Sequence, residues 1–74
     1  MIPRSQIIGC LRDDNFSYNE RGKRTEILRQ HGSGVLVAVP LRDTFTPQEA
    51  GIILAQAGFS KQRVEKFLKD CLKV

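Results

Sequence analysis

Four cations within nine residues are the side chains of this sequence that could most readily do chemistry. They are Arg21, Lys23, Arg24 and Arg29. Glu26 is the single acid among them. Cations that converge with polar donors can bind a polyanion, because nucleic acids are held mainly through their phosphates, and Thr25 can add a hydroxyl contact. The alternative is a charged hairpin tip whose cations only keep a strand edge soluble.

His31 is the only histidine, and imidazole is the side chain best suited to acid-base catalysis near neutral pH. It begins the run His31-Gly32-Ser33-Gly34, where two glycines supply the positive φ angles of a tight turn. No Asp or Glu is near enough in sequence to suggest an orienting partner. Turn formation explains His31 and Ser33 better than catalysis does, and His31 is kept as the one catalytic candidate.

Other chemistries find little support in the sequence. It has no GxxxxGK[ST], GxGxxG, HExxH or GxSxG motif. Asp13 and Asp14 are adjacent, cannot both point into one site, and are expected to be a solvated helix end. Cys10 and Cys71 form no CxxC pair and are expected to be buried thiols rather than zinc ligands or a disulfide. We therefore expect no metal and no cofactor.

The 74 residues suffice for one domain, residues 1–74, near the lower size limit for independent folding. Twelve Lys and Arg against eight Asp and Glu give a net charge of +4, which favours polyanionic partners without dictating one. No apolar run approaches the about 18 to 20 residues of a membrane span, and the N-terminus does not resemble a secretory signal. We expect a cytoplasmic protein with no membrane partner.

Hydrophobic periodicity predicts a helix over residues 4–14, followed by a strand that begins near Phe16 and includes Tyr18. These two aromatics could stack on bases, but aromatics in a strand more often belong to the core. Gly22 marks a reversal before a strand over residues 25–30, in which Thr25, Ile27 and Arg29 share one side. After the glycine turn, the apolar run VLVAV is expected to be the most buried strand of a meander, and Pro40 ends it.

Two helices are predicted in the C-terminal half. Thr46-Pro47-Gln48-Glu49 combines an N-cap, proline at the first helical position and a capping glutamate, and Gly58 is a suitable stop. Ser60 can cap a last helix with apolar residues Val64, Phe67, Leu68 and Cys71. Its outer cations are Lys61, Lys66, Lys69 and Lys73. We interpret this basic face as a solvated helix surface rather than a binding site.

The order helix, three strands, two helices predicts an α+β domain, with a three-stranded antiparallel sheet that carries helices on one face. The other face of the sheet is expected to be open.

The segments GVLVAVP and TPQEAGIILAQAGFS resemble the latter half of HicA-type toxins, small bacterial mRNA interferases of toxin-antitoxin pairs. The matching residues are Val39-Pro40, Ile52, Ile53, Leu54, Gln56, Ala57 and Gly58. The resemblance implies the α-β-β-β-α layout of a double-stranded RNA-binding domain, an RNA substrate and a HicB-like antitoxin partner. It also implies cleavage by a histidine in a Gly-Ser-His motif at the first hairpin.

This sequence departs from the family pattern at that motif. The preferred alignment of this sequence with the family motif places Lys23, Arg24 and Thr25 on Gly-Ser-His, so Thr25 occupies the histidine position. A register with Gly32-Ser33-Gly34 on the motif puts Gly34 there and leaves the fold a strand short. Threonine cannot shuttle protons near pH 7 as imidazole can.

Three hypotheses follow. The favoured one is an RNA-binding domain of HicA-like fold, with weak or no nuclease activity, whose binding residues are Arg21, Lys23, Arg24, Thr25 and Arg29. The second is an active mRNA interferase in which His31 substitutes for the missing histidine and an antitoxin covers the basic face. The third is a protein-interaction module that binds no nucleic acid.

Overall fold

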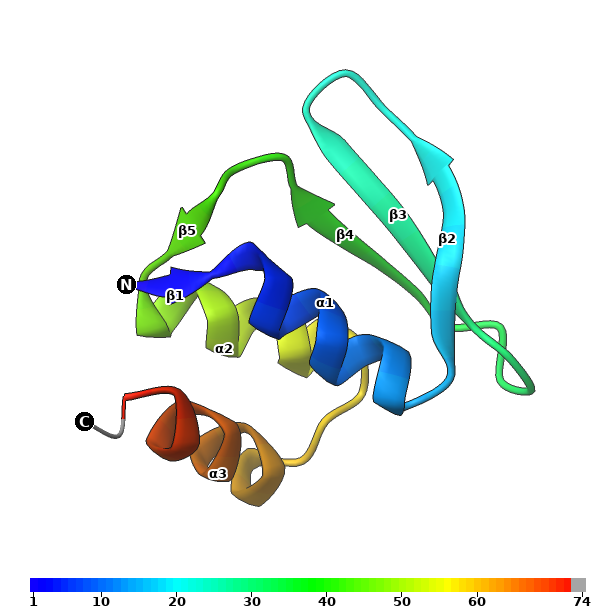
Figure 1. Ribbon diagram of the computed structural model, residues 1–74. Coiled ribbons are helices and arrows are strands. Elements are labelled where there is room, and N and C mark those ends of the chain that lie inside the picture. Colours follow the sequence, from blue (N-terminus) through cyan, green and yellow to red (C-terminus); the bar gives the residue numbers. More distant parts are fainter. Residues whose placement is uncertain (73–74) are drawn as a thin grey trace.

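The protein is an α+β domain in which a three-stranded antiparallel sheet packs against helices, as the sequence predicts. The computed structural model describes residues 1–72, and Figure 1 shows their arrangement. The elements are β1 (Ile2–Pro3), α1 (Arg4–Asp13), β2 (Phe16–Arg21), β3 (Thr25–Gln30), β4 (Leu36–Pro40), β5 (Thr44–Phe45), α2 (Pro47–Gln56) and α3 (Lys61–Cys71).

The main sheet has the order β2-β3-β4, and its two faces differ sharply in burial. Tyr18, Leu28 and Val37 lie directly across from one another and point to the helix-covered face, where Leu28 and Val37 are buried. Their neighbours alternate to the other face, which carries exposed Leu36 and Arg29. This open face carries Ser17, Glu20, Thr25, Ile27, Arg29, Leu36, Ala38 and Pro40.

The apolar run before Pro40 was predicted to be the most buried strand rather than an edge strand, and its position at an edge contradicts that placement. β4 is an edge of the main sheet, and β3 is the central strand. Only Val37 and Val39 of β4 are buried, whereas Leu36 and Ala38 are exposed on the open face. An apolar run resembles a strand covered on both faces, but here helices cover only one.

A second, two-stranded sheet pairs the chain's beginning with the segment before α2. In it, β1 runs antiparallel to β5 and places Ile2 across from Phe45, and both side chains are fully buried. The backbone N–H of Arg4 donates to the carbonyl of Asp43 at 2.8 Å. This pairing was not predicted, because two-residue strands have no recognisable period.

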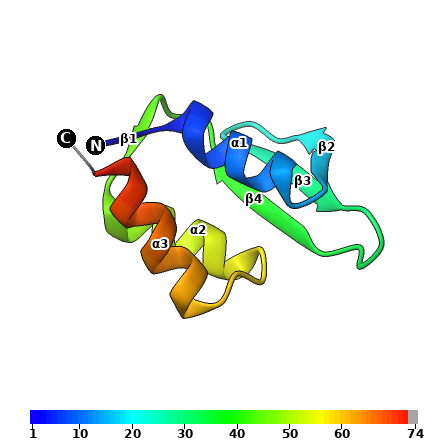
Figure 2. The same ribbon diagram turned by 60° about the horizontal axis from the view of Figure 1, so that its bottom comes forward.

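The helices form layers that lie progressively farther from the sheet. Figure 2 shows α3 as the outermost helix, with α1 and α2 nearer the strands. Accordingly α1 buries Ile7 and Leu11 completely, whereas α3 has no fully buried residue. The predicted apolar side chains of α3 are half-buried against the core. The core therefore depends mainly on α1, α2 and the two sheets.

The predicted caps of α2 are confirmed. The Thr46 hydroxyl accepts from the Glu49 backbone N–H at 3.1 Å, and the Glu49 carboxylate accepts from the Thr46 N–H at 2.9 Å. The pKa of Glu49 is lowered, mainly by the hydrogen bond from the Thr46 backbone and next by the hydrogen bond from the Arg42 side chain. Gly58 ends the helix with a φ of 94°. This helix start is thus fixed by residues adjacent in sequence.

We predict that Thr46→Ala lowers the free energy of unfolding by about 1 kcal/mol, because the Glu49 N–H loses its acceptor. The matched control is Gln48→Ala in the same exposed turn, which removes no cap and should change stability by less than about 0.5 kcal/mol. Urea denaturation measures both. Equal losses in the two variants would contradict the role assigned to the Thr46 hydroxyl.

Candidate nucleic-acid interface

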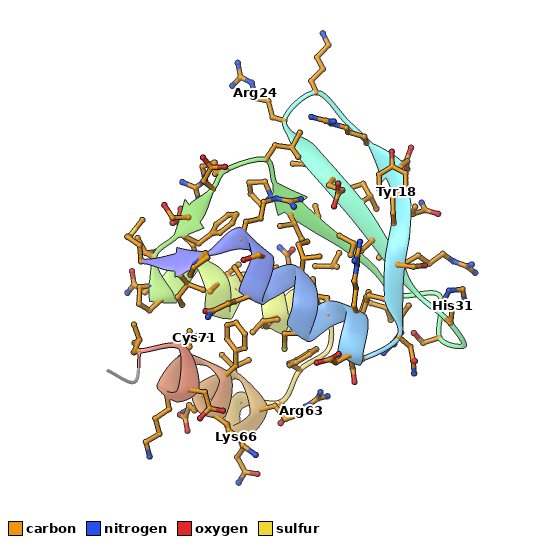
Figure 3. The ribbon with its side chains drawn as sticks, viewed as in Figure 1. Tyr18, Arg24, His31, Arg63, Lys66 and Cys71 are labelled. Carbon is orange, nitrogen blue, oxygen red and sulfur yellow. The ribbon has the colours of Figure 1, made fainter. Side chains whose placement is uncertain are left out.

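The β2–β3 hairpin tip presents three of the predicted binding residues. Arg21 ends β2, and Lys23 and Arg24 occupy the turn, which a 2.9 Å bond from the Gly22 N–H to the Thr25 carbonyl closes. All three cations are exposed, and Figure 3 shows Arg24 extending from the tip. Within residues 1–72, none of the three forms an ion pair. We call Arg21, Lys23 and Arg24 the basic tip.

Glu26 is the acid closest to the basic tip along β3, and a distant residue engages it. Its carboxylate accepts from the Arg4 guanidinium at 3.1 Å, and the Arg4 Nε also donates to the Pro40 carbonyl at 3.4 Å. Arg21 lies directly across from Glu26 on the helix-covered side of the sheet, opposite to the face that carries Thr25. Arg4 therefore offsets the charge of Glu26, which would otherwise reduce the positive potential of the tip.

Thr25 and Arg29 both lie on the open face, but at opposite ends of β3. Thr25 is half-buried across from Pro40, close to the basic tip. Arg29 is four residues farther along, about 13 Å away at the usual rise of a strand. Its guanidinium lies beside Gly34, in the next turn. The five residues predicted to bind one ligand thus divide into the basic tip with Thr25 and a separate position at Arg29.

His31 lies at the Arg29 end of the sheet, where it contacts Ser17, a residue with no functional signal in the sequence. The His31 Nε2 is 3.1 Å from the Ser17 Oγ, and its backbone N–H donates to the Asn15 carbonyl at 2.9 Å. Figure 3 shows His31 exposed at the β3–β4 turn, far from Arg24. Among the described residues no carboxylate bonds to His31, so the arrangement lacks the orienting acid of a catalytic triad.

The glycine turn around His31 forms as predicted. Gly32 and Gly34 have φ angles of 95° and 74°. Ser33 also acts within the turn, because its hydroxyl donates to the Gln30 side chain and accepts from the Val35 N–H. Ser33 therefore has structural partners.

Asp14 is not the solvated helix end that the sequence suggested. Its carboxylate accepts from the Arg63 guanidinium and from the Gln30 amide, each at 3.2 Å. Arg63 also lies over the Phe59 ring, 4.0 Å from its centroid. Asp13 is exposed, as expected. Asp14 thus links α1, β3 and α3, a role invisible in sequence because Arg63 is 49 residues away.

The two aromatics of β2 have different environments. Phe16 is buried in the core, whereas Tyr18 is 57% exposed. Tyr18 faces the same side of the sheet as Leu28, opposite to Ser17 and Arg29. A base stacked on Tyr18 would therefore lie on the other face of the sheet from Arg29.

The two cysteines lie close to each other on the surface. Cys10 and Cys71 are free, half-buried thiols that line one surface groove between α1 and α3, and burial raises the pKa of both. Within residues 1–72, no group of three or more His, Cys, Asp or Glu side chains is placed to hold a metal ion. None of the helices described is long and apolar enough to cross a bilayer.

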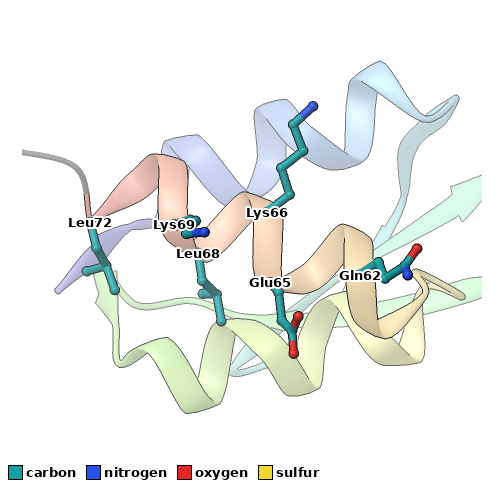
Figure 4. A pocket seen from close by; sticks show the side chains of 6 residues that line it. All are labelled: Gln62, Glu65, Lys66, Leu68, Lys69 and Leu72. Carbon is teal, nitrogen blue, oxygen red and sulfur yellow. The ribbon is translucent and has the colours of Figure 1, made fainter.

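The basic face of α3 is exposed over the residues that the structure describes. Its described cations Lys61, Lys66 and Lys69 are exposed, and Lys73 lies outside the described residues. Figure 4 shows Lys66 pointing away from Leu68 and Leu72 in an open groove along α3. The exposure of these three cations is consistent with the predicted solvated surface.

Comparison of the chain with protein-family models, with curated proteins and with solved structures gave no match. Kinship with HicA-type toxins therefore stays a prediction that rests on the residues quoted for it.

The glycine turn that carries His31 gives a stability prediction. We expect Gly34→Ala to lower the free energy of unfolding by about 1 to 2 kcal/mol, because alanine disfavours a positive φ. Gly9→Ala is the matched control, since Gly9 lies within α1 with no atom within 4 Å of an added Cβ. That change should raise stability by about 0.8 to 1 kcal/mol through helix propensity. Thermal unfolding measures both, and a stabilising Gly34→Ala would contradict the assigned turn.

Proposed function

We propose that this protein binds RNA through phosphate contacts at the basic tip and does not cleave it. The observation that carries the proposal is the exposure of three cations on one hairpin, without an ion pair among the described residues, while Arg4 engages the nearby Glu26. When exposed cations of this kind neutralise phosphates, the counterions condensed on the nucleic acid are released. This release supplies most of the affinity of sequence-independent binding.

RNA is favoured over other polyanions for two reasons. The resemblance to HicA-type toxins implies an RNA substrate and the layout of a double-stranded RNA-binding domain. In addition, A-form helices are read mainly through their backbone and 2′-hydroxyl groups, which suits exposed cations on a projecting hairpin. Structured RNA is therefore the preferred ligand.

The absence of cleavage is proposed from the position that the family gives to its histidine. Thr25 occupies that position and is half-buried across from Pro40. His31 lies at the other end of β3, where its one side-chain partner among the described residues is the Ser17 hydroxyl. A general base must lie within hydrogen-bond reach of the proton that it removes. RNA phosphates held at the basic tip are about 13 Å from that end of the strand. At the His31 end, no carboxylate among the described residues orients the imidazole for acid-base catalysis.

We predict that Lys23→Ala combined with Arg24→Ala weakens binding of all RNA sequences alike. The plot of log affinity against log salt has a negative slope, and its magnitude should decrease by about 2, which is about one for each lost phosphate contact. Fluorescence anisotropy with a labelled RNA hairpin at several salt concentrations measures both quantities.

The matched control is Lys66→Ala with Lys69→Ala, which removes the same charge from α3. If the control weakens binding equally, net charge and not the basic tip is responsible. If wild-type protein retains no RNA at low salt, the proposal fails and a protein-interaction module becomes the better hypothesis.

We further predict that the protein, produced alone in a bacterial host, leaves growth and cellular mRNA intact. Growth arrest that a HicB-like antitoxin relieves would contradict this and support an active mRNA interferase. In that event His31→Ala is decisive, because full toxicity of this variant would exclude His31 as the catalyst.

A further inference from the structure

Three polar side chains gather at the end of the open face farthest from the basic tip. Ser17 of β2 lies directly across from Arg29 of β3, and its hydroxyl is 3.1 Å from the His31 Nε2. All three side chains are exposed. We call Ser17, Arg29 and His31 the distal cluster. It combines a guanidinium, a hydroxyl and an imidazole, the groups with which proteins commonly contact phosphate oxygens.

The backbone around the distal cluster is held by hydrogen bonds on both sides. The His31 N–H donates to the Asn15 carbonyl just before β2, and the Gln30 N–H donates to the Val35 carbonyl across the turn, each at 2.9 Å. The Gly34 N–H closes the turn onto the Gln30 carbonyl at 3.0 Å. These bonds tie the turn to the start of β2, so the cluster does not depend on an unsupported loop.

Asp14 lies near the turn, but its carboxylate is on the other side of the sheet from the distal cluster. Gln30 alternates with Arg29 and therefore points to the helix-covered face, where its amide donates to the Asp14 carboxylate. Asp14 is also engaged by Arg63. Arg29 forms no ion pair within the part of the chain that the structure describes. The guanidinium charge is thus available on the open face.

We propose that the distal cluster is a second phosphate-binding position, which holds a phosphate group of the same RNA that the basic tip binds. The Arg29 guanidinium supplies the charge and paired N–H donors. With the proton of His31 on Nε2, the imidazole donates to the Ser17 oxygen, and the hydroxyl proton of Ser17 is then free to bond a phosphate oxygen. The inference rests on the proposed function and extends its site across the open face.

The length of β3 fits this arrangement. The four residues from Thr25 to Arg29 span about 13 Å, whereas each strand of a DNA duplex carries one charge per about 3.4 Å of its axis, a spacing of the same order as in RNA. A short segment of one strand therefore reaches both positions. Between them lie half-buried Ile27 and exposed Ala38, whereas Glu20 is the one acid on this face of the described sheet. Because Glu20 belongs to the β2 edge, the path with least repulsion runs over β3 and β4.

The decisive variant is Arg29→Ala, measured with the labelled RNA hairpin across a salt series. We expect weaker binding and a salt dependence whose slope is smaller in magnitude by about 1. Arg29→Lys should keep the wild-type slope because it keeps the charge. Ser17→Ala should weaken binding without changing the slope, and Ser17→Thr should restore it. Arg12→Ala, an exposed arginine of α1, is the charge-matched control. An Arg29→Ala slope equal to that of wild type overturns the proposal.

A second measurement separates this proposal from the proposed function. Backbone amide shifts of residues 17, 29 and 31 are followed during titration with the RNA and, separately, with inorganic phosphate. Shifts with both ligands support a phosphate position on RNA. Shifts with inorganic phosphate alone, without RNA binding, overturn the proposed function and leave a site for free phosphate. If RNA shifts only the amide signals of the basic tip, the distal cluster is not a phosphate-binding position, and the proposed function stands.

Discussion

The register of β3 between its two neighbours fixes the position of every residue that the proposed interface uses. Leu28 is 1% exposed in the centre of that strand and lies between Tyr18 and Val37. A slip by one residue would turn Leu28 to the open face and bury Arg29, because successive side chains of a strand alternate. Burial of a charge without a partner is costly, so the hydrophobic core enforces the display of Arg29 and Thr25.

Helix α1 supports that register from two directions. Ile7 and Leu11 belong to the same buried cluster as Leu28, and the first residue of the helix, Arg4, reaches the Glu26 carboxylate on β3. At its other end, Asp14 accepts from the Gln30 amide. One helix thus contacts both ends of β3 through polar groups and its centre through the core. The strand β3, which leads to the basic tip, is therefore held by α1 at both ends and at its centre.

Features fixed by neighbouring residues could be predicted from the sequence, and features fixed by distant ones could not. The Thr46–Glu49 capping box and the positive φ angles at Gly34 and Gly58 follow from local chemistry, and the structure confirms them. The Ser17–His31 pair depends instead on a strand register that brings together residues 14 positions apart.

The same reasoning explains the misplaced strand and the divided site. The apolar run before Pro40 indicated burial on both sides, but only the packing of the helices determines how many faces of a sheet are covered. Arg29 is near the basic tip in sequence, and the sequence therefore predicts a single site for all these cations. In a strand, five positions in sequence are also a substantial distance in space, which separates Arg29 from Lys23 and Arg24.

The placement of the acids, more than the number of cations, distinguishes the hairpin from α3. Glu26 is engaged by Arg4, Asp14 by Arg63 and Glu49 by Arg42. Each pair keeps an acid near a cation that lies outside the basic tip and the distal cluster. Of the two acids of the β2–β3 hairpin, Glu20 forms no ion pair among the described residues, so it offsets part of the charge of the tip. On α3, by contrast, Glu65 and Asp70 are interspersed with exposed lysines, so the charges of opposite sign offset one another along the helix. A modest net charge of +4 can therefore produce a locally positive surface at the hairpin.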